Sequence, residues 1–296
     1  MQKLNGVIPV VVTPLTAELE VDERSLVRLM EYLERHKIGG YWILGTGGED
    51  MSLSYQQRLR VAEISTAYND GRLPLILGSS FFSTTESKTF LKDTERLNFS
   101  AYHYMPYHTL VGLENIAEIY QMLAGQASRP LWIYTSANWT RFIPPDFIAR
   151  LCDHPNIEGI KFSTSNAVHI EKALTYQSDS FQVLTAVVKQ FLSSLSMGAR
   201  AGTTVEACLF PNEVIAISER FSQGEYANAL SAQRELNRKL ESTTTGAGDD
   251  NFLRVAEIKY ALSLKGICEP FVCHPYRMLD KAEREIIAAV VSNSSS

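Results

Sequence analysis

Short apolar segments alternate with amphipathic helical patterns over roughly the first three quarters of the 296-residue chain. Most of these segments lack period-two alternation, as the run Val7-Ile8-Pro9-Val10-Val11-Val12 illustrates. Continuous apolar runs of this length are typical of strands that are buried on both faces of a parallel sheet. Pro9 fits best near the start of its strand, where a missing N–H does least harm. Eight strands are predicted, at Ile8–Thr13, Gly40–Leu44, Pro74–Leu77, Ala101–Met105, Pro130–Tyr134, Ile157–Phe162, Gln182–Leu184 and Ala201–Thr204.

The segments between these strands carry helix signals. Asp22 is a good N-cap for a helix with Leu26, Met30 and Leu33 on one face. A second amphipathic face is formed by Leu113, Ile116, Ile119, Tyr120 and Leu123. Pro144-Pro145 is typical of the start of a further helix. Eight strands, most of them followed by a helix, predict an α/β fold of the (β/α)₈ barrel type.

A doubly wound open sheet is the alternative architecture. Such a sheet normally has fewer strands and often carries a G-x-G-x-x-G turn after the first strand. Here the first strand is followed by Thr13-Pro14-Leu15 instead. The barrel is therefore the favoured fold.

The pattern changes from about Glu225 onwards. Three helices are predicted, at Tyr226–Leu240, Phe252–Leu264 and Asp280–Val291, with no clear strands between them. Residues 242–250 are rich in threonine, glycine and aspartate and are typical of a loop. The sequence therefore predicts a barrel over residues 1–224 and a helical extension over residues 225–296 that packs on it.

Charge and cysteine content exclude several classes of protein. The formal net charge is −5 and no basic run stands out, which argues against nucleic acid or an anionic membrane as the main partner. No stretch approaches 18 apolar residues, and the N-terminus lacks the apolar core of a signal peptide. We therefore expect a cytosolic protein with no membrane segment. Its four cysteines are few for this length and predict free thiols.

Lys161 closes the apolar stretch Ile157-Glu158-Gly159-Ile160-Lys161-Phe162. A lysine buried in a dry pocket has a lowered pKa, so more of it is the neutral amine that attacks carbonyls and forms Schiff bases. A strand-end lysine that reaches solvent is the alternative. The residues at the ends of the other strands indicate whether Lys161 is a buried nucleophile or a solvent-exposed lysine.

The carboxyl ends of barrel strands are where active sites form. After strand two comes Gly45-Thr46-Gly47-Gly48-Glu49, either an anion-binding turn with exposed N–H groups or an ordinary glycine-rich turn. After strand four comes Pro106-Tyr107-His108, Tyr134 ends strand five, and Thr204 ends strand eight. A phenol and a hydroxyl beside an amine form a proton relay for Schiff-base chemistry, although a single strand-end tyrosine is often a core residue. The combination of Thr46, Tyr134 and Lys161 favours the catalytic interpretation.

These residues resemble those of the pyruvate-dependent class I aldolase family, which includes dihydrodipicolinate synthase, N-acetylneuraminate lyase and 2-keto-3-deoxygluconate aldolase. The similarity covers nearly the whole chain. It is carried by Gly6-Val7-Ile8-Pro9, Thr13-Pro14, Gly45-Thr46-Gly47-Gly48-Glu49, Pro106-Tyr107, Ile133-Tyr134, Gly159-Ile160-Lys161 and Lys259-Tyr260-Ala261-Leu262.

The resemblance implies a Schiff base between Lys161 and the keto carbon of pyruvate or a related 2-oxo acid, with no cofactor. N–H groups of the turn around Thr46 and Gly47, flanked by Gly45 and Gly48, would hold the substrate carboxylate, and Tyr134 would transfer protons. Relatives are commonly tetramers built from dimers, in which a tyrosine after strand four completes the relay of the neighbouring subunit. Here His108 stands at the second tyrosine of the family's Pro-Tyr-Tyr, so either Tyr107 serves or the relay is altered.

Several positions depart from the synthase branch of the family. Its arginine for a second carboxylate is replaced by Trp139, with Arg141 close but offset. Tryptophan cannot pair with a carboxylate, which argues against aspartate semialdehyde as the partner. Thr185-Ala186-Val187 stands where the family often has Gly-Asp-Asp. Trp139 with Val187 and Val188 favours an aromatic or less polar aldehyde. His108, Trp139, Arg141 and Thr204 complete the predicted substrate-binding set.

Three functional hypotheses follow. The first is a Schiff-base lyase or aldolase that cleaves or condenses a 2-oxo acid with an aldehyde, with a 2-keto-3-deoxy sugar acid as one candidate substrate. The second is a degenerate family member that binds a 2-oxo or sugar acid as a sensor or scaffold. The third is a metal-dependent lyase that uses His103, His108 or the Cys268, Cys273 and His274 cluster, although no zinc-like spacing is present.

Overall fold

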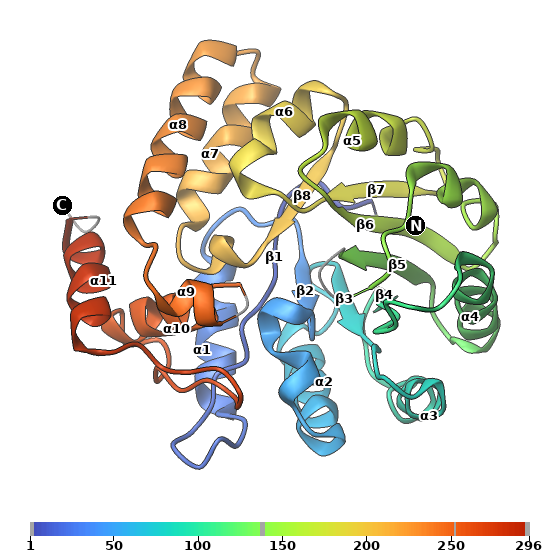
Figure 1. The fold of residues 1–296 in the computed structure, drawn as a ribbon, viewed down its shortest axis with the longest axis horizontal. Helices are drawn as coiled ribbons and strands as arrows, with labels where there is room; N and C mark the ends of the chain where they lie inside the picture. The colour runs from blue at the N-terminus through green and yellow to red at the C-terminus, as the bar shows by residue number, and fades with distance from the viewer. Residues whose placement is uncertain (1–2, 137–139, 252, 294–296) are drawn as a thin grey trace.

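Eight parallel strands form the centre of the computed structural model, which describes residues 3–136, 140–251 and 253–293 (Figure 1). The strands are β1 (Gly6–Pro9), β2 (Tyr41–Ile43), β3 (Leu75–Gly78), β4 (Ala101–Tyr104), β5 (Leu131–Ser136), β6 (Ile157–Ser163), β7 (Gln182–Thr185) and β8 (Ala201–Thr204). From β2 to β8 each strand pairs with its neighbour in chain order, and β8 pairs with β1. A parallel bridge between Val10 and Trp42 joins the β1 and β2 sides. The predicted (β/α)₈ barrel is confirmed.

Helices surround the strands, and several of them, such as the first and fourth, present an apolar face to the barrel. They are α1 (Glu23–Glu34), α2 (Tyr55–Asn69), α3 (Thr84–Asp93), α4 (Leu113–Gln126), α5 (Ala167–Leu174), α6 (Phe191–Ser196) and α7 (Pro211–Ser222). Asp22 caps α1 as predicted, since its carboxylate accepts the Ser25 N–H at 3.1 Å. The segment led by Pro144 forms a six-residue 3₁₀ helix, η3 (Pro145–Arg150), where an α-helix was expected.

The first strand ends earlier than the sequence predicts. It runs from Gly6 to Pro9, so Pro9 closes the strand and does not open it. Beyond it, Val10 N–H donates to Thr204 at 3.0 Å on one side, whereas Val11 N–H donates to Trp42 at 3.0 Å on the other. The apolar run is buried throughout. The second half of this run lies between β8 and β2 and bonds to both. It is buried although it is not part of β1, so a prediction from apolar residues alone makes the strand too long.

Four helices follow the barrel: α8 (Tyr226–Ser242), α9 (Ala247–Asp250), α10 (Val255–Leu264) and α11 (Lys281–Asn293). They lie on one flank, with α8 beside α7 and α11 against α10 (Figure 1). The short helix α9 falls inside the segment expected to be a loop. The division into residues 1–224 and 225–296 stays a prediction. None of the described helices is both long enough and apolar enough to cross a membrane.

Candidate active site

Lys161 and Tyr134 are direct partners in the register between β6 and β5. Side chains at paired positions of neighbouring strands point to the same face, which here is the interior of the barrel. Both are buried, with Lys161 only 4% exposed. The Lys161 Nζ lies 4.0 Å from the centroid of the Tyr134 ring and 5.0 Å from that of Trp42. The lysine is therefore an interior residue and not one that reaches bulk solvent.

Aromatic rings surround the lysine amine. Trp42 stacks on His103 with ring centroids 4.3 Å apart and meets Tyr134 edge-on at 5.7 Å. The His103 Nε2 lies 3.0 Å from the carbonyl oxygen of Ile43. Burial, with a smaller contribution from Lys161, holds the pKa of His103 well below its usual value. A neutral imidazole adds no positive charge beside the amine.

Burial lowers the pKa of Lys161 from 10.5 to about 7. The negative charges of Asp50 and Glu206 act in the opposite direction and limit the shift. Roughly half of the amine is therefore neutral at pH 7. A neutral amine in this environment is a competent nucleophile toward a carbonyl carbon.

Thr46 is hydrogen-bonded to Tyr134, with 2.8 Å between the threonine Oγ1 and the phenol oxygen. Thr46 belongs to a 3₁₀ turn, η1 (Thr46–Gly48), which is followed by a second, η2 (Asp50–Ser52). A Cβ at Gly47 would lie 2.9 Å from a methyl group of Val205, and one at Gly48 would lie 2.9 Å from the Val11 carbonyl. Glycine at both positions lets the turn lie close to the neighbouring chain and keeps Thr46 beside the phenol.

A fully buried ion pair anchors this turn from behind. The Glu49 carboxylate contacts the Lys259 ammonium of α10, and both side chains are completely inaccessible to solvent. Glu49 also accepts the Cys273 N–H at 2.7 Å, and Lys259 donates to the Phe271 carbonyl at 2.8 Å. The extension is thus tied directly to the loop that carries Thr46. Sequence reasoning identified Lys259 only as a point of family similarity.

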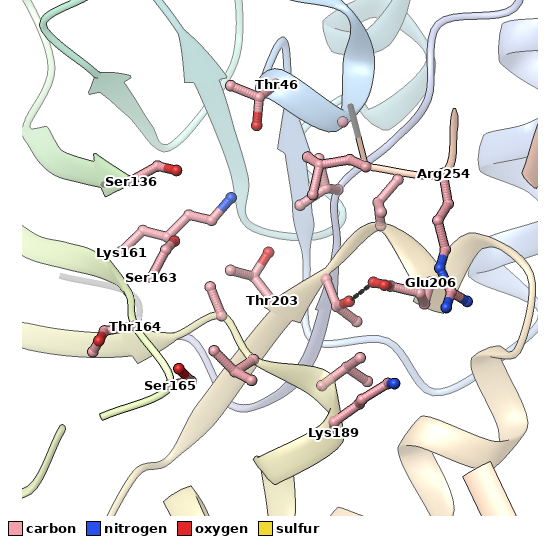
Figure 2. A pocket seen from close by; sticks show the side chains of 18 of the residues that line it. Thr46, Ser136, Lys161, Ser163, Thr164, Ser165, Lys189, Thr203, Glu206 and Arg254 are labelled. Atoms are coloured by element: carbon pink, nitrogen blue, oxygen red, sulfur yellow. Dashed lines mark hydrogen bonds between the residues drawn. The ribbon is translucent and has the colours of Figure 1, made fainter. Parts of the chain in front are cut away.

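A pocket of about 500 Å³ opens above the amine. This volume is typical of small-molecule sites, which span about 300–1,000 Å³. Figure 2 shows the Lys161 side chain extending into it, with hydroxyl groups of Ser136, Ser163, Thr164 and Ser165 on one side. The other side carries Lys189, Glu206 and Arg254. The remaining residues around it are Val10, Thr46, Gly47, Tyr134, Ala186, Val187, Val188, Thr203, Thr204, Val205, Leu240 and Leu253.

The predicted site residues are only partly brought together. The pocket contains Thr46, Gly47, Tyr134, Lys161 and Thr204. Two further glycines, Gly45 and Gly48, are buried within the turn beside it. The Arg141 side chain is exposed. Trp139 lies outside the described residues.

The predicted residues of the loop after β4, Tyr107 and His108, do not line the pocket that contains Lys161. Tyr107 is buried, and its phenol donates to the carboxylate of Asp50 in the same chain. Burial raises the pKa of Asp50. His108 packs on the exposed ring of Phe82, with centroids 4.4 Å apart. Within this chain, Tyr107 therefore meets a carboxylate that sequence reasoning did not pair with it.

Some pocket residues were missed in the sequence. Ser163 carried a usable signal, because it follows Lys161 by two positions on one strand and so shares its face. Lys189 and Glu206 lie in short 3₁₀ helices after β7 and β8, and their sequences carried no such signal. Arg254 belongs to the extension, whose docking on the barrel no local pattern reveals.

The proposed metal ligands have other partners. His103 is stacked on Trp42, and Cys268 and Cys273 are buried free thiols. Burial raises the pKa of both thiols to about 12. Across the described ranges, no three His, Cys, Asp or Glu side chains are grouped to hold a metal ion.

Comparison with known proteins agrees with this geometry. Residues 3–294 match the model of the dihydrodipicolinate synthetase family. The chain is 25% identical over 291 residues to 4-hydroxy-tetrahydrodipicolinate synthase of Thermodesulfovibrio yellowstonii, covering 98% of both chains. It is 25% identical to the probable 2-dehydro-3-deoxy-D-pentonate aldolase YjhH of Escherichia coli, covering 93% of this chain and 92% of that one.

A solved structure is similar over the same extent. Dihydrodipicolinate synthase from Bacteroides thetaiotaomicron superposes with a TM-score of 0.91 at 27% identity, covering 98% of each chain. The match therefore spans the barrel and the extension together. The chain belongs to the dihydrodipicolinate synthetase family and is an enzyme of its class I, pyruvate-dependent aldolase and lyase type.

Proposed function

We propose that this enzyme uses Lys161 to form a Schiff base with pyruvate and joins it to, or releases it from, a hydroxylated aldehyde. The substrate in the cleavage direction is then a 2-keto-3-deoxy sugar acid. One observation carries the proposal: the Lys161 amine is buried, has a pKa of about 7, and lies beside the Tyr134 phenol that Thr46 orients.

The steps follow from this placement. The neutral amine of Lys161 adds to C2 of pyruvate, and the carbinolamine loses water to give a protonated imine. Loss of a proton from C3 gives an enamine, because the imine nitrogen accepts the electron pair. C3 then bonds to the aldehyde carbon, whose oxygen takes up a proton, and water releases the product. Tyr134 transfers the protons, and N–H groups around Thr46 and Gly47 hold the carboxylate.

The hydroxyl groups in the pocket support a hydroxylated aldehyde. Serine and threonine side chains at or just after the ends of β5, β6 and β8 line the pocket, beside aliphatic side chains that include Val187 and Val188. Hydroxyl groups that line a site bind a substrate with matching hydroxyls and disfavour one without them. The lining therefore favours a sugar-derived aldehyde over the aromatic or less polar one that Trp139 and the two valines favour. The similarity to the probable pentonate aldolase agrees with this choice.

Assembly into a homo-oligomer, a dimer or tetramer, is part of the same proposal. The loop after β4 carries His108 and the exposed side chain of Leu110, beside the exposed ring of Phe82. Clustered exposed apolar groups are typical of protein interfaces. His108 would then contact the neighbouring subunit, while Tyr107 stays with Asp50 in its own chain.

The experiment is borohydride reduction in the presence of pyruvate, followed by intact mass measurement. We expect a single covalent adduct on the wild-type enzyme and none on Lys161→Ala. The Lys189→Ala variant is the matched control and should keep the adduct, because Lys189 is an exposed residue at the pocket mouth. An adduct that survives in Lys161→Ala would disprove the role of this lysine. Thermal stabilisation by pyruvate without any adduct would favour a sensor.

A further inference from the structure

Two cationic side chains lie on the outer side of the pocket, away from the Schiff-base lysine. Lys189 follows β7, and Arg254 immediately precedes α10. Both line the pocket that contains Lys161. Figure 2 shows them across the pocket from Ser136. Neither has a part in the imine chemistry, so their presence needs a separate explanation.

Arg254 is held firmly in place. Its guanidinium donates to the Leu240 carbonyl at 2.5 Å, and to the hydroxyls of Thr243 at 3.2 Å and Thr244 at 2.5 Å. Since a guanidinium has five N–H groups, donors remain for a ligand. The backbone is also unusual, because Leu253 and Arg254 have φ of 58° and 47° in the left-handed region. Such conformations persist where the surrounding structure enforces them, and they cluster at binding sites.

The charges on this side are not balanced within the chain. Over residues 3–136, 140–251 and 253–293, no carboxylate lies within ion-pair distance of Lys189 or Arg254. Glu206 lies on the same side, where its carboxylate accepts the Thr204 hydroxyl. Two cations thus face one carboxylate, in a protein whose formal net charge is −5. A local positive excess in an acidic protein favours an anionic ligand.

Thr203 supplies an independent observation. It is 2% exposed, and its Oγ1 has no hydrogen-bond partner among the described residues. Figure 2 shows it between Lys161 and Glu206, on the path from the amine to the cations. A buried hydroxyl without a partner is unfavourable, because it has lost its hydrogen bonds to water and gained none in return. A substrate hydroxyl bound at this point would satisfy it.

We infer that the aldehyde portion of the substrate ends in an anionic group, a carboxylate or a phosphate, that binds Lys189 and Arg254, with an intervening hydroxyl bound by Thr203. This inference rests on the proposed function and narrows its substrate class. The 2-oxo acid carboxylate is held at the Thr46 turn, so the outer cations bind a second anion. Arg254 and Lys189 thereby provide the positive charge for a second anion that Trp139 cannot provide, and they come from segments later in the chain.

The test compares three aldehydes in pyruvate condensation: glyceraldehyde, glyceraldehyde 3-phosphate and tartronate semialdehyde. The first is neutral and hydroxylated, and the others add a phosphate and a carboxylate. We expect kcat/KM for at least one anionic aldehyde to exceed that for glyceraldehyde by about tenfold or more, since hydrogen bonds to charged groups contribute about 1.5–3 kcal/mol. The better of the two identifies the anion.

Substitutions at Lys189 and Arg254 test whether these two residues cause the preference for an anionic aldehyde. Lys189→Met and Arg254→Gln should each lower kcat/KM for the preferred anionic aldehyde, mainly through KM, by a larger factor than they lower kcat/KM for glyceraldehyde, so that the ratio of the two falls. Lys92→Met is the matched control, because it removes the same charge from the exposed face of α3. Arg254→Gln also loses contacts to α8, so its pyruvate adduct after borohydride reduction serves as the check that the Lys161 site is intact.

Two results would overturn the inference while leaving the proposed function standing. One is equal kcat/KM for neutral and anionic aldehydes in an enzyme that forms the pyruvate adduct. The other is an anionic preference that both pocket variants retain. Absence of the adduct in the wild-type enzyme would instead remove the proposed function itself, so the two failures are distinguishable.

Discussion

Burial of the Lys161 amine beside Tyr134 and Trp42 links reactivity to stability at the scale of single residues. About half of the amine is neutral near pH 7 because the folded protein disfavours its charged form. The same effect opposes folding, since the unfolded chain carries a solvated ammonium at that pH. From the folded pKa of about 7 up to the ordinary value of 10.5, the unfolded chain binds more protons, so this residue makes stability rise with pH.

The pH dependence of imine formation follows from the same pKa. The reactive form is the neutral amine, which is lost as pH falls through about 7. The rate of adduct formation with subsaturating pyruvate should therefore be about tenfold lower at pH 6 than at pH 8, and level above pH 8. Rapid-quench borohydride trapping across this range measures it.

Asp50→Asn tests the electrostatic cause. The Asp50 charge raises the pKa of Lys161 against the effect of burial, so its removal should move the midpoint of the rate profile to lower pH. A wild-type midpoint near 10 would show that the amine is not desolvated in solution and would contradict this account.

At the scale of elements, the turn that carries Thr46 depends on α10 for its position. The buried pair of Glu49 and Lys259 joins them, with the Cys273 N–H as a third contact. A buried ion pair contributes little net stability relative to apolar residues, but removing one partner leaves an uncompensated charge. The pair therefore acts chiefly to fix where the turn lies.

Double-mutant analysis of this pair gives a further prediction. Glu49→Gln and Lys259→Met should each lower the free energy of unfolding by about 3–5 kcal/mol, because each leaves one buried charge without its partner. The double variant should be less destabilised than the sum of the two. Urea unfolding measures all three. Strictly additive losses would show that the two charges do not interact.

The sequence predicted the strand elements well because strands buried on both faces leave continuous apolar runs, and their carboxyl ends meet on one side of a barrel. Lys161 and Tyr134 could be placed together for that reason. Pro9 was misplaced because the apolar run stays buried beyond the last residue of β1, where Val10 and Val11 bond to neighbouring strands on opposite sides. Asp50 and Arg254 escaped prediction because their positions beside Tyr107 and in the pocket depend on how distant segments pack, and nothing in their local sequence encodes that contact.

At the scale of the whole molecule, a surface patch at the loop after β4 bears on assembly, where His108 packs on the ring of Phe82 and Leu110 follows two positions later. Phe82 is 70% exposed and Leu110 is 93% exposed. If this patch is a subunit interface, Leu110→Asp should shift the protein from oligomer to monomer, because a buried unpaired carboxylate is strongly unfavourable. Sedimentation velocity measures the change.

Val168→Asp is the control for this prediction. Val168 is 72% exposed on α5, so the same charge is added to an apolar residue on a different element. That variant should sediment like the wild-type enzyme. A wild-type enzyme that is monomeric at micromolar concentration would remove the interface altogether.

The pocket is built from two separately encoded parts of the chain. The amine and phenol come from β6 and β5, whereas Leu240 and Arg254 come from α8 and the approach to α10. Engineers seeking new products could therefore diversify the pocket-facing residues of this tail, provided that Lys259 and the segment around Cys273 are kept, because these hold the turn that carries Thr46.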